Sequence, residues 1–514
     1  MQLSHGRLIC RAHNRFPLSL ALSQPLFAFR KSIRHQKRLV TSATEACAHT
    51  LEPDVRPSDD PATNGSVEAD VVDSTEAAPE ALQWTIHRKT TAKGYWYNRE
   101  DPRVVNQRLL KKTKAAYKAG EDYEAVIVKP LEHRLPDNAK LPWIHKDEEK
   151  PLSGHDRLSV EIDRFYEFAK PDRYEQIARE HVIEQVRDHV RQVFPDHDLV
   201  VFGSERTGLA FATSDIDLRW IPTSTSADSA LPPSPDQRRK AISELRSLRQ
   251  KLLTMNDAYF PPKFLHARYA LITMRDAQSS LDIQIVLAND TTRSRTLMRN
   301  YMRQYPYLLS LYFVVKTIFD VRGLSHVFDG GFGSYTIFMM IVASIRHHPH
   351  PTNDAAGGLL HFLEFWRDFD TTKHVVSIQP VELIPKDSVQ IMTHKTKENI
   401  QKGSSKTLPP YMLSLRDPAD RTNDLGRKGI TIKHLQRTFK SLYTSLYNGV
   451  KLNNTPSVLG PLVEASYRIN HSRRRTLRKY GKSLANQENS GEKAPGVDNT
   501  ASMIREDDEA QKEA

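Results

Sequence analysis

The spacing of apolar residues divides the central part of the chain into a stretch with both helix and strand patterns and a stretch that is mainly helical. Between Pro171 and Pro195, apolar residues recur at three- and four-residue steps from Ile177 to Phe194, which predicts an amphipathic helix. Short apolar runs and alternating segments follow this helix and predict strands. We expect helices over residues 177–194 and 242–253, and strands over residues 199–202, 216–221, 265–274 and 281–287. This part of the chain is therefore expected to be a mixed α/β unit.

The pattern changes after about Thr296. From there to Tyr447 it is mainly helical, and no segment alternates as clearly as a strand should. Two stretches rich in Ser, Pro, Gly and charged residues, 223–237 and 385–410, predict loops inserted into the folded body. The apolar runs 308–319 and 338–345 are shorter than the roughly 20 residues that a membrane-spanning helix needs. We therefore expect buried helices and no membrane insertion.

Charge is distributed unevenly along the 514 residues, whose formal net charge is +12. Residues 1–44 hold eight basic and no acidic residues, residues 45–82 hold ten acidic residues and one basic residue, and residues 483–514 hold eight acidic and three basic residues. The body between 83 and 482 is therefore strongly basic, which suits a polyanionic partner such as nucleic acid. Because only Cys10 and Cys47 are present, we expect neither a disulfide framework nor a cysteine zinc site in that body.

The N-terminal composition predicts targeting. A basic, acid-free segment with Ser and apolar residues is typical of a mitochondrial presequence, and we assign residues 1–44 to one. The alternatives are a secretory signal, although Gln24-Pro25 interrupts its apolar run, and a basic arm of a nuclear or cytosolic protein. The acidic residues 45–82 contain few large apolar groups, which predicts a disordered linker.

Candidate chemistry lies around two aspartates. Asp215 and Asp217 are two residues apart in a predicted strand, so both side chains leave the same face. Neighbouring carboxylates repel one another unless a cation lies between them, which predicts a divalent metal, Mg²⁺ by default. An isolated pair of this kind is more often a solvent-exposed feature of an edge strand. Here, Gly203-Ser204 directly follows a strand and can hold a phosphate, and Asp282 opens another strand and can supply a third carboxylate. Three carboxylates and a phosphate-binding turn are what two-metal phosphoryl transfer needs.

This arrangement resembles the DNA polymerase β-type nucleotidyltransferases. Three further segments make the chain similar to the noncanonical poly(A) polymerases of the Trf and Cid type, over about residues 141–450. These are the entry segment Leu141-Pro142-Trp143-Ile144, the helix start Gly330-Gly331-Phe332-Gly333-Ser334-Tyr335, and the loop with Ser414-Leu415-Arg416-Asp417-Pro418 and Asn423-Asp424-Leu425-Gly426-Arg427. The resemblance implies a fungal-type member, mitochondrial or nuclear.

The resemblance implies a role for each matching position. Asp215, Asp217 and Asp282 would be the catalytic metal ligands, and Asp282 would help to remove the proton of the attacking 3′-hydroxyl. Gly203 and Ser204 would hold the triphosphate. The full set of implied nucleotide-binding residues is Gly203, Ser204, Asn289, Lys316, Ser334, Tyr335, Asn423 and Arg427. The implied cofactor is Mg²⁺ or Mn²⁺, with ATP as the substrate.

The base that is added depends, by the same resemblance, on Asn423. Relatives that add uridylyl groups carry His at the matching position, whereas adenylyl-adding relatives carry Asn. An Asn side chain leaves room for a purine and offers both a donor and an acceptor. We therefore expect ATP to be preferred over UTP.

Several of these residues have ordinary structural alternatives. Tyr335, which the resemblance stacks on the base, could be a packing aromatic, and Lys316, which it places near the triphosphate, could be a lysine with its stem on apolar surface. The ribose contact implied for Asn289 could instead be made by Asn300.

One position differs from the family pattern, and one short histidine run could be mistaken for a metal site. Many relatives carry a second Lys where this chain has Asp320, and Arg322 is the residue that could compensate. The run His347-His348-Pro349-His350 follows a predicted helix and lacks Cys or acidic partners, so we interpret it as a solvated turn and not as a metal site.

RNA would need a surface of its own. A basic run lies beyond the expected folded core, and Arg and Lys mix with aromatic residues over 84–114, which suits single-stranded RNA. Both segments could equally be solvated arms. The RNA-binding candidates of the basic run are Arg473, Arg474, Arg475, Arg478 and Lys479.

We therefore expect an α+β fold, with a polymerase β-like nucleotidyltransferase domain, a mainly helical central domain and disordered termini. The expected activity is template-independent addition of AMP from ATP to RNA 3′ ends, with an RNA-binding adaptor or helicase as a further partner. The alternatives are a nuclear surveillance enzyme, a terminal uridylyltransferase, a gap-filling DNA polymerase and an inactive RNA-binding relative. The expected segments are a presequence (1–44), an acidic linker (45–82), a basic extension (83–150), an entry helix with the catalytic domain (151–290), a PAP-associated helical domain with the nucleotide-recognition loop (291–470), and a basic run followed by an acidic disordered tail (471–514).

Overall fold

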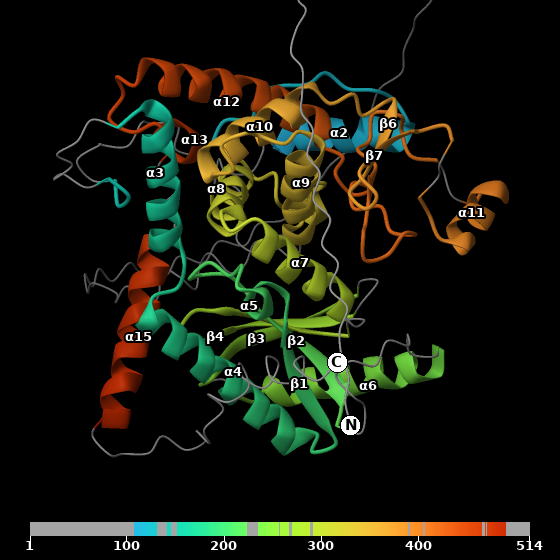
Figure 1. The fold of residues 1–514 in the computed structure, drawn as a ribbon. Coiled ribbons are helices and arrows are strands. Elements are labelled where there is room, and N and C mark those ends of the chain that lie inside the picture. Colours follow the sequence, from blue (N-terminus) through green and yellow to red (C-terminus); the bar gives the residue numbers. More distant parts are fainter. Residues whose placement is uncertain are drawn as a thin grey trace, which may run out of the picture. The chain divides into compact units, whose positions relative to one another are not determined.

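The structure of the chain is a computed structural model, shown in Figure 1. It describes residues 107–130, 141–144, 152–223, 235–255, 257–266, 270–287, 291–388, 391–404, 407–464, 468 and 470–489. The presequence, the acidic linker and the tail after Asn489 lie outside these residues. The domain boundaries expected there stay predictions.

A mixed sheet forms the first folded part, as the sequence predicted, and it has five strands where four were expected. Its strands are β1 (His197–Phe202), β2 (Ile216–Pro222), β3 (Tyr259–Leu265), β4 (Leu271–Asp276) and β5 (Asp282–Val286). In space their order is β1-β2-β5-β4-β3, with β2 and β5 parallel and the other neighbours antiparallel. Two strands that are distant in the sequence, β2 and β5, therefore lie side by side in the middle of the sheet.

One face of this sheet is covered by the helices α4 (Arg173–Val193) and α6 (Pro235–Leu252). The two helices contact each other and share a hydrophobic core with the inward residues of the strands, including Ile216, Leu218 and Trp220. Because side chains alternate along a strand, the residues between these three point to the opposite face. That opposite face carries the candidate chemistry.

The second folded part is mainly helical, as predicted, and has its own core. Its helices are α3 (Gly154–Ala169), α7 (Thr292–Gln304), α8 (Leu308–Asp320), α9 (Ser334–His347), α10 (Ala355–Asp368), α12 (Ile432–Leu452) and α13 (Gly460–Val463), with a short 3₁₀ turn at Val327–Asp329. Almost every residue of α8 and α9 is buried, which explains why their sequences are apolar without a clear polar face. Within the described residues, no helix is both long enough and apolar enough to cross a membrane.

This helical part also contains a small sheet that the sequence pattern did not predict. Its strands are β6 (His374–Ser377), β7 (Glu382–Pro385) and β8 (Leu415–Arg416), in the order β7-β6-β8. The sequence pattern between Thr296 and Tyr447 was mainly helical and showed no clear strand, and the structure adds these three. These strands have only two to four residues each, which is too few for an alternating pattern to be recognised.

Two further boundaries differ from the prediction. The strand expected over 265–274 is the end of β3 and the beginning of β4, which are antiparallel neighbours. Pro261 and Pro262 hid the first of these strands, because proline is tolerated only in an edge strand or at an irregularity, and β3 has both. The loop expected over 385–410 contains a short helix, α11 (His394–Gln401).

The described residues of the basic extension pack on the helical part. The Tyr123 hydroxyl donates to the backbone oxygen of Ile430 at 2.7 Å, and Thr113 of α2 (Gln107–Ala119) is hydrogen-bonded to His434 at 3.0 Å. These contacts show that residues 107–130 are part of the folded body and not a solvated arm.

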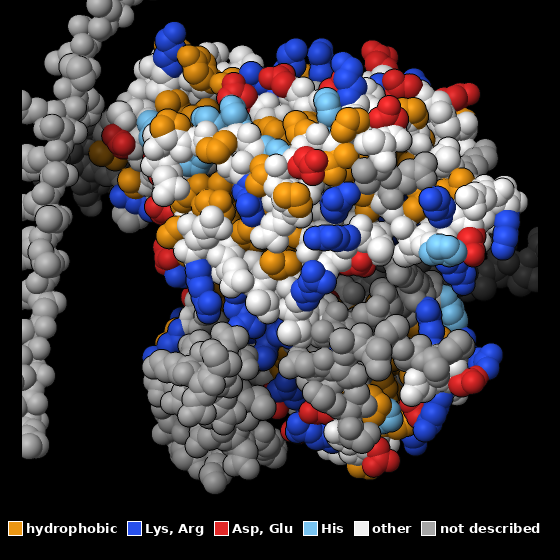
Figure 2. Space-filling view, turned by 45° about the vertical axis from the view of Figure 1, so that its right-hand side comes forward, with side chains coloured by type: hydrophobic (Ala, Val, Ile, Leu, Met, Phe, Trp, Pro, Cys, Tyr) orange, Lys and Arg blue, Asp and Glu red, His pale blue; other side chains and the backbone are white. Residues whose placement is uncertain are grey.

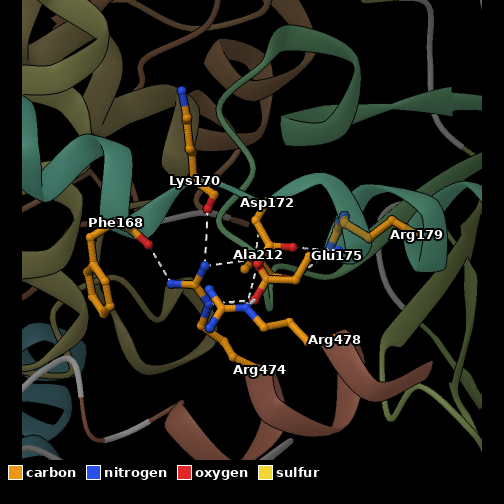
Figure 3. A network of polar contacts seen from close by, with 8 residues as sticks. All are labelled: Phe168, Lys170, Asp172, Glu175, Arg179, Ala212, Arg474 and Arg478. Atoms are coloured by element: carbon orange, nitrogen blue, oxygen red, sulfur yellow. Dashed lines mark hydrogen bonds and ion pairs between the residues drawn. The ribbon is translucent and has the colours of Figure 1, made fainter. Parts of the chain in front are cut away.

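The last helix, α15 (His471–Asn489), packs against α4 through a buried ion pair. The guanidinium group of Arg474 donates to both oxygens of Glu175 at 2.7 Å and to the backbone oxygens of Phe168 and Lys170 (Figure 3). A Cβ at Gly481 would lie only 1.9 Å from a backbone oxygen of α4, so a glycine is needed for the helices to approach this closely. The expectation that the basic run lies beyond the folded core was therefore wrong, and the helix continues past residue 483.

We expect Arg474→Ala to lower the free energy of unfolding by about 3 kcal/mol, because it leaves the fully buried carboxylate of Glu175 without its main partner. Arg478, which lies 3.2 Å from Glu175, cannot replace the lost backbone contacts. The measurement is urea unfolding followed by circular dichroism. The matched control is Arg475→Ala, an exposed neighbour whose loss should change stability by less than about 0.5 kcal/mol. Equal stabilities of the two variants would contradict this account of α15.

Candidate active site

Asp215 and Asp217 lie on the face of the sheet that α4 and α6 leave uncovered. Asp217 is in β2 and Asp215 directly precedes it, whereas Ile216 and Leu218 are fully buried on the opposite face. The alternation of the strand therefore places both carboxylates on one face, as the sequence predicted. Because β2 lies between β1 and β5, the pair is not a feature of an edge strand.

The parallel pairing of β2 with β5 brings a third aspartate beside this pair. The register aligns Asp217 with Gln284, and the same register two residues earlier aligns Asp215 with Asp282. Aligned residues of neighbouring strands point to the same face, so all three carboxylates and the Gln284 amide do so. Gln284 donates through Nε2 to Oδ2 of Asp215 at 2.7 Å. Its position two residues after Asp282 could have been recognised in the sequence.

This environment raises the pKa of two of the three carboxyl groups. Burial, with a further contribution from Asp215, raises the pKa of Asp217 to about 7, although Arg179 opposes the shift. Burial raises the pKa of Asp282 to about 6, although Arg473 and Arg275 lower it. Buried carboxylates that destabilise one another in this way are stabilised by a bound cation, and oxygen ligands suit a hard divalent ion.

Two guanidinium groups hold Asp282. Arg275 on β4 donates through Nε to Oδ1 at 2.9 Å, and Arg473 on α15 donates through Nη2 to Oδ2 at 2.9 Å. Within the described residues, the oxygens of the three aspartates are not all within 4.8 Å of one another. The sequence contained a signal for Arg275, which faces Asp282 across a hairpin, but none for the pairing of Arg473 with Asp282.

The turn after β1 approaches the aspartates closely. Gly203 begins α5 (Gly203–Thr207) with φ of +67°, in the left-handed region that favours glycine. A Cβ at this position would lie 2.3 Å from Oδ2 of Asp217, so a larger residue would push the turn away. Glu205 accepts from Nε of the buried Arg179 at 3.0 Å, which fixes the turn against α4. Ser204 lies within this fixed turn.

Tyr335 and Asn423, from distant parts of the sequence, are joined by one carboxylate. Oδ1 of Asp417 accepts from the hydroxyl of Tyr335 at 2.8 Å, and Oδ2 accepts from Nδ2 of Asn423 at 2.8 Å. The predicted base-stacking and base-reading residues therefore lie close together. Ser334 is the first residue of the same helix, α9, and Arg427 is exposed in the loop. The linking role of Asp417 was not predicted from the sequence.

Asp424 organises the recognition loop that carries Asn423. Its Oδ1 accepts from the backbone amides of Leu415 at 3.0 Å and Gly426 at 2.9 Å, and its Oδ2 accepts from the hydroxyl of Ser414 at 3.0 Å. A Cβ at Gly426 would lie 2.2 Å from a backbone oxygen, which explains the glycine at this position. The residues after Asn423 therefore have a structural role that holds the loop in one conformation.

The positive charge expected near the triphosphate is smaller than predicted. Lys316 on α8 forms an ion pair with Asp320 one turn later. Arg322 is buried and donates to two backbone oxygens at 3.2 and 2.9 Å, so the expectation that it compensates for the missing second lysine was wrong. Burial lowers the pKa of His326. The charge of Lys316 lowers this pKa further, whereas the charge of Asp215 raises it. The sequence contained no signal that this histidine lies near both groups.

The residues of the basic run differ in their surroundings. Arg474 and Arg478 form ion pairs with residues at the start of α4, and Arg473 pairs with Asp282. Arg475 and Lys479 are exposed. On the face seen in Figure 2, Lys and Arg side chains are spread among acidic and apolar ones, so charge alone does not mark an RNA path there. Asn289, the expected ribose contact, lies outside the described residues.

Comparison with known proteins agrees with this geometry. Residues 158–303 match the family model "Poly(A) RNA polymerase, mitochondrial-like, central palm domain". Poly(A) RNA polymerase protein 2 of Saccharomyces cerevisiae is 26% identical over 322 residues, which cover 60% of this chain and 51% of that protein. Poly(A) RNA polymerase cid14 of Schizosaccharomyces pombe is 25% identical over 366 residues, which cover 67% of this chain and 50% of that protein. The chain thus spans about half the length of these relatives.

The fold is also that of a solved polymerase. The structure described as the polymerase core of TRAMP, a RNA surveillance complex, matches with a TM-score of 0.52 at 24% identity, and the match covers 63% of this chain and 99% of that one. This likeness shows the fold. Over the region that these comparisons share, the chain is therefore similar to poly(A) RNA polymerases, and its residues 158–303 match the central palm domain of that family model.

Proposed function

We propose that the chain is a template-independent nucleotidyltransferase that adds AMP from ATP to RNA 3′ ends. The observation that carries the proposal is the alignment of Asp215, Asp217 and Asp282 on one face of two central strands, with Gly203 placed directly against them. The curated relatives that share this region are named poly(A) RNA polymerases. A terminal uridylyltransferase would differ in its contact with the base, and an inactive relative would not depend on the carboxylates.

The three aspartates are the residues that would hold divalent cations, Mg²⁺ or Mn²⁺. When bound, such ions neutralise phosphate charge and make the attacking 3′-hydroxyl more acidic. Around them, Gln284 orients Asp215 through its amide, and Arg275 and Arg473 orient Asp282. These neighbours would be positioning residues, because they would act through the carboxylates that they hold.

The nucleotide would extend from the turn at Gly203 towards α9. The hydroxyl of Ser204 would donate to a phosphate oxygen, and Lys316 would neutralise part of the triphosphate charge in competition with Asp320. The ring of Tyr335 would stack on the base while its hydroxyl remains bound to Asp417. Catalysis would then depend mainly on positioning and on neutralisation of charge.

The preference for adenine follows from the way in which Asp417 holds Asn423. An ionised carboxylate only accepts hydrogen bonds, so Nδ2 of Asn423 must face it, and the amide oxygen is left to face a base. Adenine carries an amino donor on its Watson–Crick edge, whereas uracil, like thymine, carries an acceptor oxygen at the corresponding position. An amide held in this orientation would therefore bind adenine and leave uracil unpaired.

Partners and location are part of the same proposal. Arg475 and Lys479 are exposed and are not among the arginines of the basic run that pair with Asp172, Glu175 or Asp282, so they could contact RNA. We propose an RNA-binding adaptor or helicase as a further partner, because the structural neighbour is the core of a RNA surveillance complex. The location proposed is the mitochondrion, on the composition of residues 1–44, with the nucleus as the alternative.

Extension of RNA should depend on each of the three aspartates. In an assay with a labelled RNA, ATP and Mg²⁺, we expect Asp215→Ala, Asp217→Ala and Asp282→Ala each to lower the rate by at least about a hundredfold, because each removes charge that acts on the transition state. Asp196→Ala, at an exposed aspartate of the same domain, is the matched control and should keep the wild-type rate. Robust extension by the Asp215→Ala/Asp217→Ala double variant would refute the metal-site proposal.

Loss of activity in these variants should not reflect unfolding, and Asp217 allows a direct check. Its pKa is raised from 3.8 to about 7 in the fold, so the stability that this group contributes is present below about pH 4 and is lost as the pH rises through 7. At pH 8 without divalent metal, Asp217→Asn should therefore raise Tm by about 2–4 °C, and the gain should be smaller at pH 5. A lower Tm at pH 8 would contradict the charge argument.

Competition between nucleotides tests the role of Asn423. With ATP and UTP together, we expect the wild type to favour ATP by about tenfold to a hundredfold, because a lost polar contact costs about 1–3 kcal/mol when it leaves a buried group unpaired. Asn423→His should narrow this margin, whereas Arg421→Ala, an exposed neighbour in the same loop, should not change it. A wild type that prefers UTP would remove the poly(A) assignment and leave the nucleotidyltransferase assignment intact.

The location is tested by import. We expect residues 1–44, fused to a fluorescent protein, to reach mitochondria because they carry eight basic residues and no acidic one. A fusion with four of these basic residues replaced by Gln is the control and should remain outside. A diffuse signal for the first fusion, together with nuclear full-length protein, would remove the mitochondrial assignment.

A further inference from the structure

Three side chains of metal-binding type converge at the end of α9, where the sequence predicted a solvated turn. His348 directly follows α9, and His361 and Glu364 are three residues apart on one face of α10. One ligand atom of each lies within 4.8 Å of those of the other two, and all three side chains are half-buried. The acidic partner that the histidine run lacks in the sequence is therefore supplied by the next helix.

The two imidazole rings are available as ligands. Their centroids are 4.5 Å apart, and within the described residues neither Nδ1 of His348 nor Nδ1 of His361 has a hydrogen-bond partner, although both atoms are buried. A neutral imidazole has the free lone pair that a metal requires.

The other two histidines of the run 347–350 already make hydrogen bonds. His350 uses Nδ1 for Thr352 at 3.1 Å and Nε2 for the hydroxyl of Tyr307 at 2.8 Å. His347 uses Nε2 for a backbone oxygen of β6 at 2.8 Å. Buried polar atoms normally have partners, so the pair of unpartnered Nδ1 atoms on His348 and His361 calls for an explanation.

Glu364 is oriented by the groups around it. Its Oε1 accepts from the hydroxyl of Tyr443 at 3.2 Å and from Nη2 of Arg367 at 3.4 Å. The guanidinium of Arg367 lies over the ring of Tyr443, 3.7 Å from its centroid, and also donates to Asp368 at 2.7 Å, which partly offsets its charge. Hydrogen bonds from residues that are not themselves ligands commonly fix the orientation of a carboxylate that binds a metal.

We propose that His348, His361 and Glu364 form a transition-metal site that takes Zn²⁺ and ties the end of α9 to α10. Two imidazole nitrogens and one carboxylate oxygen are a donor set that suits zinc and not Mg²⁺. Ligand atoms of a tetrahedral zinc site lie about 3.4 Å apart, so the three side chains need to close by only a small movement. The site is separate from the three aspartates, and it would stabilise the helix that carries Tyr335 at its other end.

The test measures bound Zn²⁺ on the full chain, produced without a histidine tag and freed of metal with a chelator. By equilibrium dialysis and atomic spectroscopy, we expect His361→Gln and Glu364→Gln each to lose one tightly bound equivalent relative to wild type. His394→Gln, at an exposed histidine on α11, is the matched control and should lose none. The same loss should occur in an Asp215→Asn/Asp217→Asn background, which separates this site from the proposed catalytic one.

Two further measurements distinguish loss of zinc binding from poor folding of a variant. Tyr443→Phe, which removes only the hydroxyl behind Glu364, should weaken Zn²⁺ binding by about tenfold. Zn²⁺ should also raise the Tm of the wild type and of His394→Gln but not that of His361→Gln. Equal zinc content in wild type, His361→Gln and Glu364→Gln would overturn the proposal, as would a wild-type Tm that does not respond to Zn²⁺.

Discussion

The parallel pairing of β2 with β5 places Asp215, Asp217 and Asp282 on one face of a sheet whose other face is hydrophobic core. Carboxylates gathered in this way repel one another and lose hydration, which is why the pKa of Asp217 rises to about 7. Protonation removes the charge of Asp217 below this pKa, and nearby positive charge stabilises the carboxylates that remain ionised. Much of the remaining structure around this face supplies that charge or holds it in position.

Part of that charge comes from a helix at the far end of the chain. Through α15, Arg473 reaches Asp282, and Arg474, next to it in sequence, is bound to Glu175 at the start of α4. The buried ion pair fixes the helix, and the fixed helix places Arg473 against a proposed catalytic carboxylate. Residues after the helical central part therefore complete the proposed catalytic site, and loosening α15 would be expected to act on both stability and activity.

The proposed nucleotide-binding side has a comparable organisation around Asp417. This carboxylate holds the hydroxyl of Tyr335 and the amide of Asn423, so it couples the ring proposed to stack on a base to the group proposed to read its edge. Asp424 independently fixes the loop that carries Asn423. Selectivity would then depend less on the identity of Asn423 alone than on the direction in which Asp417 forces its amide to point. The proposed zinc site lies at the opposite end of α9 from Tyr335, where it would limit movement of the same helix.

The sequence by itself determined the features that depend on short-range geometry. Alternation along β2 put Asp215 and Asp217 on one face, the 3.6-residue period predicted α4, and the glycine after β1 marked a tight turn. The short strands β6, β7 and β8 were not predicted, because the two-residue period of a strand can be recognised only over more residues than they contain.

Only the tertiary structure decided which distant charges meet. Nothing near Arg322 in the sequence shows that it turns into the core towards backbone oxygens, nor that Arg473 pairs with Asp282 and Arg474 with Glu175. The histidine run looked like a solvated turn until α10 placed Glu364 beside it. The reason is physical: helix and strand periods act over a few residues, whereas the partner of an ion or a ligand is set by how whole elements pack.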